Sequence, residues 1–250
     1  MPLQKTEAVV LKTQRSGETS KIITLYSRQL GKIKVIAKGS RGLKSRFYGT
    51  LEPLNHISIV FYFKETREIQ FLSQADIIHA YGNIKADLNK YALTTIFCEL
   101  IDRTEFEQAN PYLFQILIDV LGSIDQAQQN LINYYFWFLL RFLKISGFEP
   151  DLNRCKICGT NNPVGDVRFS IVNGNFNCVE CSSPEPNAVS ISEQAIQYLR
   201  QLQHISIKEL ESIASLKADD CEMLLLNLLQ YHIEETKYLK SIKFLRQIQN

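Results

Sequence analysis

Residues 28–46 read RQLGKIKVIAKGSRGLKSR, and this stretch decides the fold of the first part of the chain. Lys32 and Lys34 fall on one face of an extended segment, whereas the apolar side chains next to them fall on the other. Because side chains alternate along a β-strand, the pattern predicts a strand with one buried face and one basic face. Gly39 and Gly42 then break the pattern and open a flexible loop that carries further cations.

The same stretch contains no Asp or Glu, and its basic residues are Arg28, Lys32, Lys34, Lys38, Arg41, Lys44 and Arg46. Such a run either faces a polyanion or is the solvated face of an ordinary strand. The 250-residue chain has a net charge of +2, but residues 1–80 hold 13 Lys and Arg against 6 Asp and Glu, a net charge of +7. Residues 81–250 hold 15 against 20, a net charge of −5. We therefore expect nucleic acid as the partner of the front and protein as the partner of the rear.

Five short strands are predicted in the front part: Ala8–Leu11, Lys21–Tyr26, Gly31–Ala37, His56–Phe63 and Ile69–Ile78. Five strands joined by Gly- and Ser-containing turns indicate a small closed or nearly closed barrel. The oligonucleotide-binding (OB) barrel is the natural candidate, because it has five strands and a face that binds single strands. A five-stranded SH3-like barrel stays open, since periodicity does not separate the two.

After Gly82 the apolar residues recur at helical spacing, which predicts helices at Ile84–Arg103, Pro111–Ile124, Leu131–Ser146, Ala195–Gln203, Lys208–Ser215, Cys221–Lys237 and Tyr238–Ile248. The predicted fold class is α+β, with an OB-fold domain in residues 1–80 and a helical bundle in residues 81–250 that carries an insertion at residues 152–187. Aromatic residues are dense in and after the third helix: Tyr134, Tyr135, Phe136, Trp137, Phe138, Phe142 and Phe148. They are either a base-stacking platform or core, and we favour core because large apolar side chains are buried by default.

The strongest local motif is Cys155-x2-Cys158-x19-Cys178-x2-Cys181. Each Cys-x-x-Cys pair brings two thiolates to one ion, and two pairs complete a tetrahedral zinc site. Four thiolates leave no open position for water, so the single Zn²⁺ is predicted to be structural. The alternatives are two disulfides or four unpaired thiols. Cys98 and Cys221 fall on predicted helices and are interpreted as small buried residues.

Composition and the first residues point to an ordinary intracellular protein. Hydrophobic residues make up 45% of the chain and charged residues 22%, as in soluble globular proteins. The start, MPLQKTEAVVLKTQ, has no apolar run of the length that a signal peptide needs. The most apolar window, Leu131–Ile145, is interrupted by polar residues and predicts a buried helix, not a membrane span. We therefore expect a reducing cytoplasm, where paired cysteines more often bind metal than form disulfides.

No catalytic motif is found. The segment Gly39–Ser45 resembles a phosphate-binding loop, but Leu43 separates Gly42 from Lys44, so the required Gly-Lys-Ser/Thr is absent. The four histidines lie far apart in the sequence, and none has a Ser, Cys or carboxylate at motif spacing: His56, His79, His204 and His232. The sequence predicts a binding protein and not an enzyme, although clustering across the fold stays open.

Several short motifs of this chain occur together in one known family: Val10-Leu11, Gly17-Glu18, Thr24–Gly31, Ala37-Lys38-Gly39, Lys44-Ser45-Arg46 and Leu51-Glu52-Pro53-Leu54. The cysteine pairs and a closing Leu239-Lys240-Ser241 with Phe244-Leu245 follow in the same order. With these motifs the chain resembles the RecO family of bacterial recombination mediators over nearly its whole length.

This resemblance implies a barrel that binds single- and double-stranded DNA, anneals complementary strands and joins RecR. With RecR, such a protein helps to load the RecA recombinase onto strands coated by single-strand-binding protein, in the recombinational repair of DNA damage. It implies a cytoplasmic, nucleoid-associated protein with no membrane partner, whose helical domain holds the acidic C-terminal tail of single-strand-binding protein.

The mechanism that we expect needs no bond-making chemistry. Cations neutralise phosphates and release counterions, while exposed aromatic side chains stack on bases. The candidate DNA-binding residues are Arg15, Lys21, Lys32, Lys34, Lys38, Arg41, Lys44, Arg46, Phe47 and Tyr48. Annealing follows if neutralisation lowers the repulsion between two strands whose bases stay free to pair.

Two other interpretations stay open. One is a non-catalytic scaffold whose basic barrel face binds an acidic protein, and the other is an RNA-directed enzyme with an unrecognised site. A basic stripe near the end of the chain is either a contact for an acidic tail or DNA, or the solvated face of the last helix: Lys237, Lys240, Lys243 and Arg246.

Overall fold

The computed structural model describes residues 2–42, 44–104, 108–216 and 219–249. Leu43, which belongs to the predicted basic loop, lies outside the described residues. The chain divides into two compact units, Met1–Gln126 with Leu239–Asn250, and Ala127–Tyr238. The predicted domain boundary at residue 80 falls directly after the last barrel strand, whereas the compact units divide the chain after residues 126 and 238.

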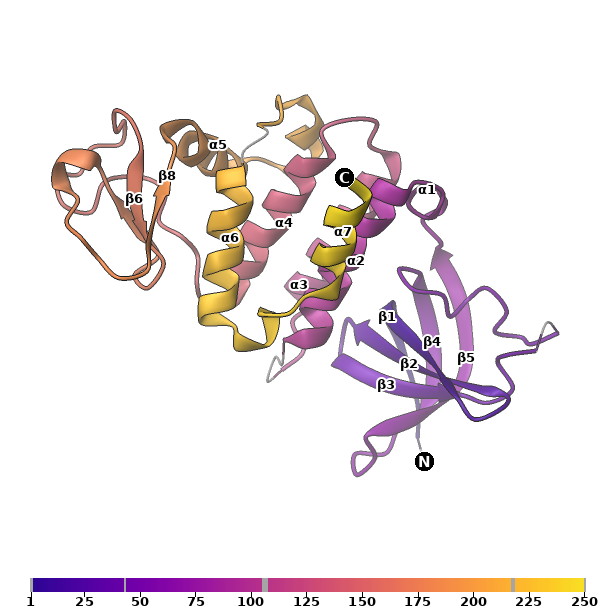
Figure 1. Ribbon diagram of the computed structural model, residues 1–250. Coiled ribbons are helices and arrows are strands. Elements are labelled where there is room, and N and C mark those ends of the chain that lie inside the picture. Colours follow the sequence, from indigo (N-terminus) through magenta and orange to yellow (C-terminus); the bar gives the residue numbers. More distant parts are fainter. Residues whose placement is uncertain (1, 43, 105–107, 217–218, 250) are drawn as a thin grey trace. The chain divides into compact units, whose positions relative to one another are not determined.

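The first unit contains a closed barrel with the strand order β1-β2-β3-β5-β4 (Figure 1). Its strands are β1 (Leu3–Ser16), β2 (Ser20–Ser27), β3 (Gly31–Ala37), β4 (His56–Tyr62) and β5 (Ile69–His79). All neighbours are antiparallel except β3 and β5, which are parallel. This non-sequential closure of five strands is of the OB type, so the predicted α+β fold with an OB barrel is confirmed.

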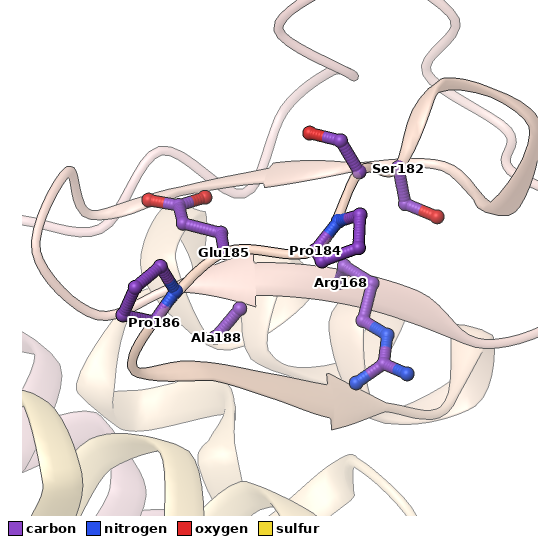
Figure 2. A pocket seen from close by; sticks show the side chains of 7 residues that line it. Arg168, Ser182, Pro184, Glu185, Pro186 and Ala188 are labelled. Carbon is purple, nitrogen blue, oxygen red and sulfur yellow. The ribbon is translucent and has the colours of Figure 1, made fainter.

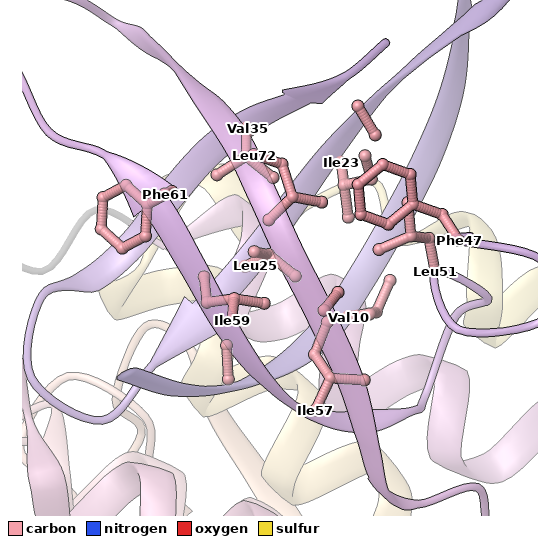
Figure 3. Packing of buried hydrophobic residues seen from close by; sticks show 13 residues of the cluster. Val10, Ile23, Leu25, Val35, Phe47, Leu51, Ile57, Ile59, Phe61 and Leu72 are labelled. Carbon is pink, nitrogen blue, oxygen red and sulfur yellow. The ribbon is translucent and has the colours of Figure 1, made fainter. Parts of the chain in front are cut away.

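Side chains from all five strands meet inside the barrel, as Figure 3 shows. Val35 and Ala37 of β3 are fully buried, so the predicted alternation of this strand is confirmed. The loop between β3 and β4 adds Phe47 and Leu51 to the same cluster. Burial of one Phe side chain contributes about 1.5–3 kcal/mol, so these two residues anchor the loop to the barrel. The anchored residues follow the cationic part of the segment, which was the part predicted to be flexible.

The described residues of the first unit also form the helices α1 (Gly82–Ala86), α2 (Leu88–Arg103), α3 (Pro111–Gln126) and α7 (Lys240–Gln249). The predicted single helix Ile84–Arg103 is in fact two, because Asp87 is extended and caps α2 by accepting from Asn89 N and Lys90 N. α7 packs on α2, where the Glu99 carboxylate accepts from Lys240 N (3.1 Å) and Ser241 N (2.7 Å). Burial raises the pKa of Glu99, but these bonds outweigh it and hold the pKa below its usual value.

The second unit has three helices, α4 (Leu131–Ile145), α5 (Glu193–His204) and α6 (Asp219–His232), and three strands, β6 (Val167–Ser170), β7 (Asn175–Asn177) and β8 (Ala188–Ile191). The strands form a sheet of order β7-β6-β8, which the sequence did not predict. Two predicted helices are shorter than expected. Lys208–Ser215 is a 3₁₀ turn at Ile207–Ser212, and Cys221–Lys237 is interrupted by extended backbone at Ile233.

The aromatic residues of α4 form the core of the second unit. Tyr134, Tyr135, Phe136, Trp137 and Phe138 are all buried, as is Phe142 one turn later. Helices α5 and α6 both pack on α4. The core interpretation is therefore confirmed for these six rings, whereas Phe148 is half-buried and stacks on His232.

Candidate nucleic-acid interface and metal centre

Exposed cations gather on the segment that joins β3 to β4. Lys38, Arg41, Lys44 and Arg46 are exposed, and the Tyr48 side chain of the same segment is 67% exposed. The backbone turns sharply at Gly39 and Gly49, where φ is +67° and +72°, values that glycine adopts without strain. A rigid base that presents mobile cations and one ring is suited to contacts with phosphates and bases.

One side of this segment borders a hollow of about 430 Å³, lined among others by Arg15, Lys21, Arg41 and Tyr48. Arg41 Nη1 donates to Gly17 O (2.9 Å) and Glu18 O (2.6 Å), which ties the segment to the turn between β1 and β2. Lys21 Nζ lies 3.1 Å from the Glu52 carboxylate. Four predicted residues thus lie together, with Arg41 in a positioning role and Lys21 partly neutralised.

The other side borders a hollow of about 560 Å³ that contains residues which the sequence did not single out. Lys38 and Arg46 line it together with Tyr62, Arg67 and Phe71. Lys38 Nζ and Arg67 Cζ each lie 5.0 Å from the centre of the Phe71 ring. The sequence could have indicated Phe71 through the alternation of the Ile69–Ile78 strand. Because Leu72 packs in the core, its neighbour Phe71 lies on the outer face of the strand.

Lys32 and Lys34 do not form the predicted free basic face. Lys32 Nζ donates to Asp102 O (2.8 Å) and Thr104 O (3.3 Å), carbonyl groups at the end of α2. Lys34 pairs with Glu68, and its hydrogen bond and charge lower the pKa of Glu68. The expectation is corrected because the helical part of the unit covers one end of β3, so Lys32 serves an internal contact.

Phe47 is the second correction. We expected an exposed ring, but Phe47 is 3% exposed and packs in the barrel core, as Figure 3 shows. The Arg46 guanidinium lies 4.8 Å from the ring centre. The ring is unavailable for stacking because the loop folds back onto the barrel, whereas Tyr48 points to solvent as expected.

Two histidines that are distant in the sequence meet at one end of the barrel. The rings of His56 and His79 are stacked with their centres 5.9 Å apart, and His56 Nε2 lies 3.4 Å from the Glu7 carboxylate. His56 is 4% exposed. Burial lowers the pKa of His56 more strongly than the nearby Glu7 raises it.

The four predicted cysteines meet in the second unit. Their sulfur atoms all lie within 4.8 Å of one another, and Cys158 Sγ and Cys178 Sγ are 3.8 Å apart. A tetrahedral ion with metal–sulfur bonds of about 2.3 Å holds its sulfur ligands about 3.8 Å apart. These residues therefore fit a metal ion, and the expected clustering is confirmed.

The charges of the thiols support the same conclusion. Burial raises the pKa of Cys155, but the backbone N–H groups of Cys158, Cys178 and Ile157 outweigh it and lower the pKa to about 6. Hydrogen bonds with Cys178 and Cys158 raise the pKa of Cys181. The thiolate of Cys155 is thus favoured and those of Cys178 and Cys181 are disfavoured, and a bound cation would stabilise the thiolate form of the ligands.

The remaining cysteines and the surface near the cluster have plainer roles. Cys98 and Cys221 are buried, and burial raises the pKa of each to about 12, which agrees with the small-core interpretation. A hollow of about 690 Å³ is lined by Arg168 of β6 and by residues of the segment Ser182–Ala188. Figure 2 shows these side chains. The Glu185 carboxylate there accepts from Ser170 Oγ (2.6 Å) and an Asn173 amide (3.1 Å), so it stabilises the fold of this segment.

The basic stripe near the end of the chain is exposed. Lys240, Lys243 and Arg246 lie on the face of α7 opposite to the buried Ile242 and Leu245. Lys237 Nζ lies 3.0 Å from the Glu234 carboxylate. Among the residues that the structure describes, no helix is both long and apolar enough to cross a membrane.

Family models match both parts of the chain: "Recombination protein O N terminal" over residues 1–81 and "Recombination protein O C terminal" over residues 85–241. The chain is 32% identical to the DNA repair protein RecO of Bacillus velezensis, with 99% of this chain and 96% of the relative covered. It is 31% identical to the protein of that name from Bacillus pumilus (99% and 95% covered) and 30% identical to that from Bacillus subtilis (99% and 96%).

Proposed function

The chain belongs to the RecO family of DNA repair proteins, and from this premise we propose that it acts as a recombination mediator. It binds single- and double-stranded DNA and anneals complementary strands. With RecR it helps to load RecA onto strands coated by single-strand-binding protein. It works in the cytoplasm at the nucleoid, and it is not an enzyme.

The observation that carries this proposal is the exposed basic segment of the barrel. Lys38, Lys44 and Arg46 are exposed on a segment that Phe47 anchors in the core, with Tyr48 beside them. Cations on a fixed base neutralise phosphates without reading sequence, which is what annealing of any two complementary strands requires. Because each contact releases counterions, affinity is expected to fall roughly ten- to a thousandfold between low and moderate salt.

Annealing follows from how charge is shared between two strands. A strand whose phosphates are paired with Lys38, Lys44 and Arg46 repels a second strand less. Its bases stay free, because these side chains contact the backbone and not the Watson–Crick edges. The protein lowers the cost of encounter, and base pairing supplies the driving force.

We assign the four-cysteine cluster to one structural Zn²⁺, held by Cys155, Cys158, Cys178 and Cys181. Four thiolate ligands are typical of closed zinc sites, and such an ion supplies folding free energy and no catalysis. For the acidic tail of single-strand-binding protein, Lys240 and Lys243 on the exposed face of α7 supply the positive charge.

The experiment is strand annealing with a fluorophore on one oligonucleotide and a quencher on its complement, with and without single-strand-binding protein. The test variant is Lys38→Ala/Lys44→Ala/Arg46→Ala, which spares the positioning residue Arg41. The control removes the same charge from exposed positions of the second unit: Lys144→Ala/Lys208→Ala/Arg168→Ala.

We expect the wild type and the control to accelerate annealing of coated strands and the test variant to lose this activity. No acceleration by folded, metal-loaded wild type contradicts the proposal. Binding of an acidic protein that the test variant loses would then favour the scaffold function.

A further inference from the structure

A row of apolar side chains runs across the outside of the barrel. Directly paired residues of neighbouring strands lie on the same face of a sheet. The register pairs Ile22 with Ile36, Ile36 with Phe71, Phe71 with Tyr62, and Tyr62 with Leu3. The row therefore crosses β2, β3, β5, β4 and β1 in turn. The row faces outward, because a residue adjacent to its member in each of four strands packs in the core. These adjacent residues are Ile23, Val35, Leu72 and Phe61.

Part of this row is open to solvent. Leu3 is 57% exposed and Tyr62 is 41% exposed, while Phe71 and Ile36 are half-buried. The hollow of about 560 Å³ lies over the middle of the row, so its floor is made of Ile36, Phe71 and Tyr62. An apolar, aromatic floor on the outside of a barrel marks a binding site more often than an ordinary surface.

Cations surround this floor. Lys38 directly follows the last residue of β3, and its Nζ lies 5.0 Å from the Phe71 ring centre. The Arg67 guanidinium lies at the same distance, and Arg46 lines the hollow from the basic segment. A flat apolar floor rimmed with cations matches a ligand that combines flat rings with anionic groups. An unpaired nucleotide strand is such a ligand.

We propose that this hollow is a base-binding subsite for single-stranded DNA. Unpaired bases stack on Phe71 and Tyr62, Lys38 and Arg67 shift from the Phe71 ring toward the flanking phosphates, and Arg46 contacts a phosphate at the edge of the hollow. Their long side chains permit this movement without a change in the barrel. The proposal rests on the proposed DNA binding and adds discrimination between strand states.

The discrimination follows from geometry. In a duplex the bases are paired and stacked inside, so they do not reach the floor of the hollow, whereas the phosphates of both forms reach the basic segment. Single strands thus make two kinds of contact and duplexes make one. The product of annealing is held less tightly than its precursor, which favours its release.

The test compares Phe71→Leu with Phe71→Trp in the full chain. Leucine keeps an apolar side chain but removes the ring, and tryptophan keeps a stacking surface. The control is Phe63→Leu, which removes a half-buried ring that packs against the core. The probes are a fluorescein-labelled poly(dT) strand, a labelled duplex of equal length, and a single strand that contains 2-aminopurine. Thermal melting followed by circular dichroism checks that each variant is folded.

We expect Phe71→Leu to weaken single-strand binding about tenfold, to leave duplex binding within about twofold, and to remove the quenching of 2-aminopurine. Phe71→Trp and Phe63→Leu retain wild-type preference. Equal loss of both DNA forms, or no change in single-strand binding by a folded Phe71→Leu variant, overturns the subsite. If wild type binds neither DNA form, the proposed function itself fails, so the two failures are distinguished.

Discussion

The barrel and the cysteine module of this chain use their polar side chains in opposite ways. In the barrel, an apolar core from five strands stabilises the fold, and the cations of the segment between β3 and β4 lie outside it. In the module, residues 152–191, the four thiols face one another within 4.8 Å, and only Cys155 and Cys178 are buried. The barrel is therefore expected to fold without a ligand and to bind one reversibly, whereas the module is expected to need its metal to fold.

The largest effect is expected from loss of the metal. Cys178→Ser removes one of four ligands, and structural zinc sites contribute on the order of 10 kcal/mol to folding. We expect elemental analysis to find one zinc per wild-type chain and less than one in the variant. Limited proteolysis is expected to cut the module while DNA binding by the barrel stays within about twofold of wild type.

Cys98→Ala serves as the control, because Cys98 is buried in the first unit and is not one of the four clustered cysteines. It is expected to keep the metal. If Cys178→Ser also lost DNA binding by the barrel, the barrel and the module would not fold independently of each other.

Phe47→Ala and Tyr48→Ala separate core from surface within one segment. Phe47 is buried in the barrel, so its removal leaves a cavity and is expected to lower the free energy of unfolding by about 3–5 kcal/mol. Tyr48 is exposed, and its removal is expected to change the free energy of unfolding by less than about 0.5 kcal/mol. Urea unfolding followed through the barrel amide signals in NMR measures both. A large destabilisation by Tyr48→Ala would contradict its placement at the surface.

His56 is expected to make the barrel sensitive to acid. Its pKa in the folded state is lowered by burial, so below the ordinary histidine pKa of about 6.5 the unfolded chain binds more protons than the folded one. The free energy of unfolding therefore decreases as the pH falls through that value. Urea midpoints of the barrel at pH 7.5 and 5.5 are expected to differ less in His56→Gln than in wild type. His204→Gln, at an exposed position of the second unit, is expected to leave the difference unchanged.

The smallest effect is expected from Lys34. It pairs with Glu68 at the surface, where ion pairs contribute little because water screens them. Lys34→Ala is expected to leave the unfolding midpoint unchanged within error. If Lys34→Ala weakened DNA binding as much as Lys38→Ala does, Lys34 would have to be a DNA contact.

How far the sequence predicted each region depends on how local the region is. The cysteine ligands come in two pairs with tight spacing, so their meeting followed from short motifs. The barrel interface was predicted where cations lie close together in the sequence, as at Lys44 and Arg46. Phe71 was missed because its place beside Ile36 depends on the parallel pairing of β3 with β5. Phe47 was misassigned because only the packed structure shows a loop folding back into the core.

The most direct test of the account is the salt dependence of single-strand affinity. Fluorescence anisotropy of a labelled oligonucleotide, titrated from about 50 to 300 mM salt, gives the slope of log affinity against log salt. We expect a steep negative slope for wild type. The slope of Lys38→Ala/Lys44→Ala/Arg46→Ala is expected to be shallower by about two, because each phosphate contact contributes about 0.7 to the slope. A flat slope for wild type, or an unchanged slope in the variant, would contradict phosphate neutralisation by this segment.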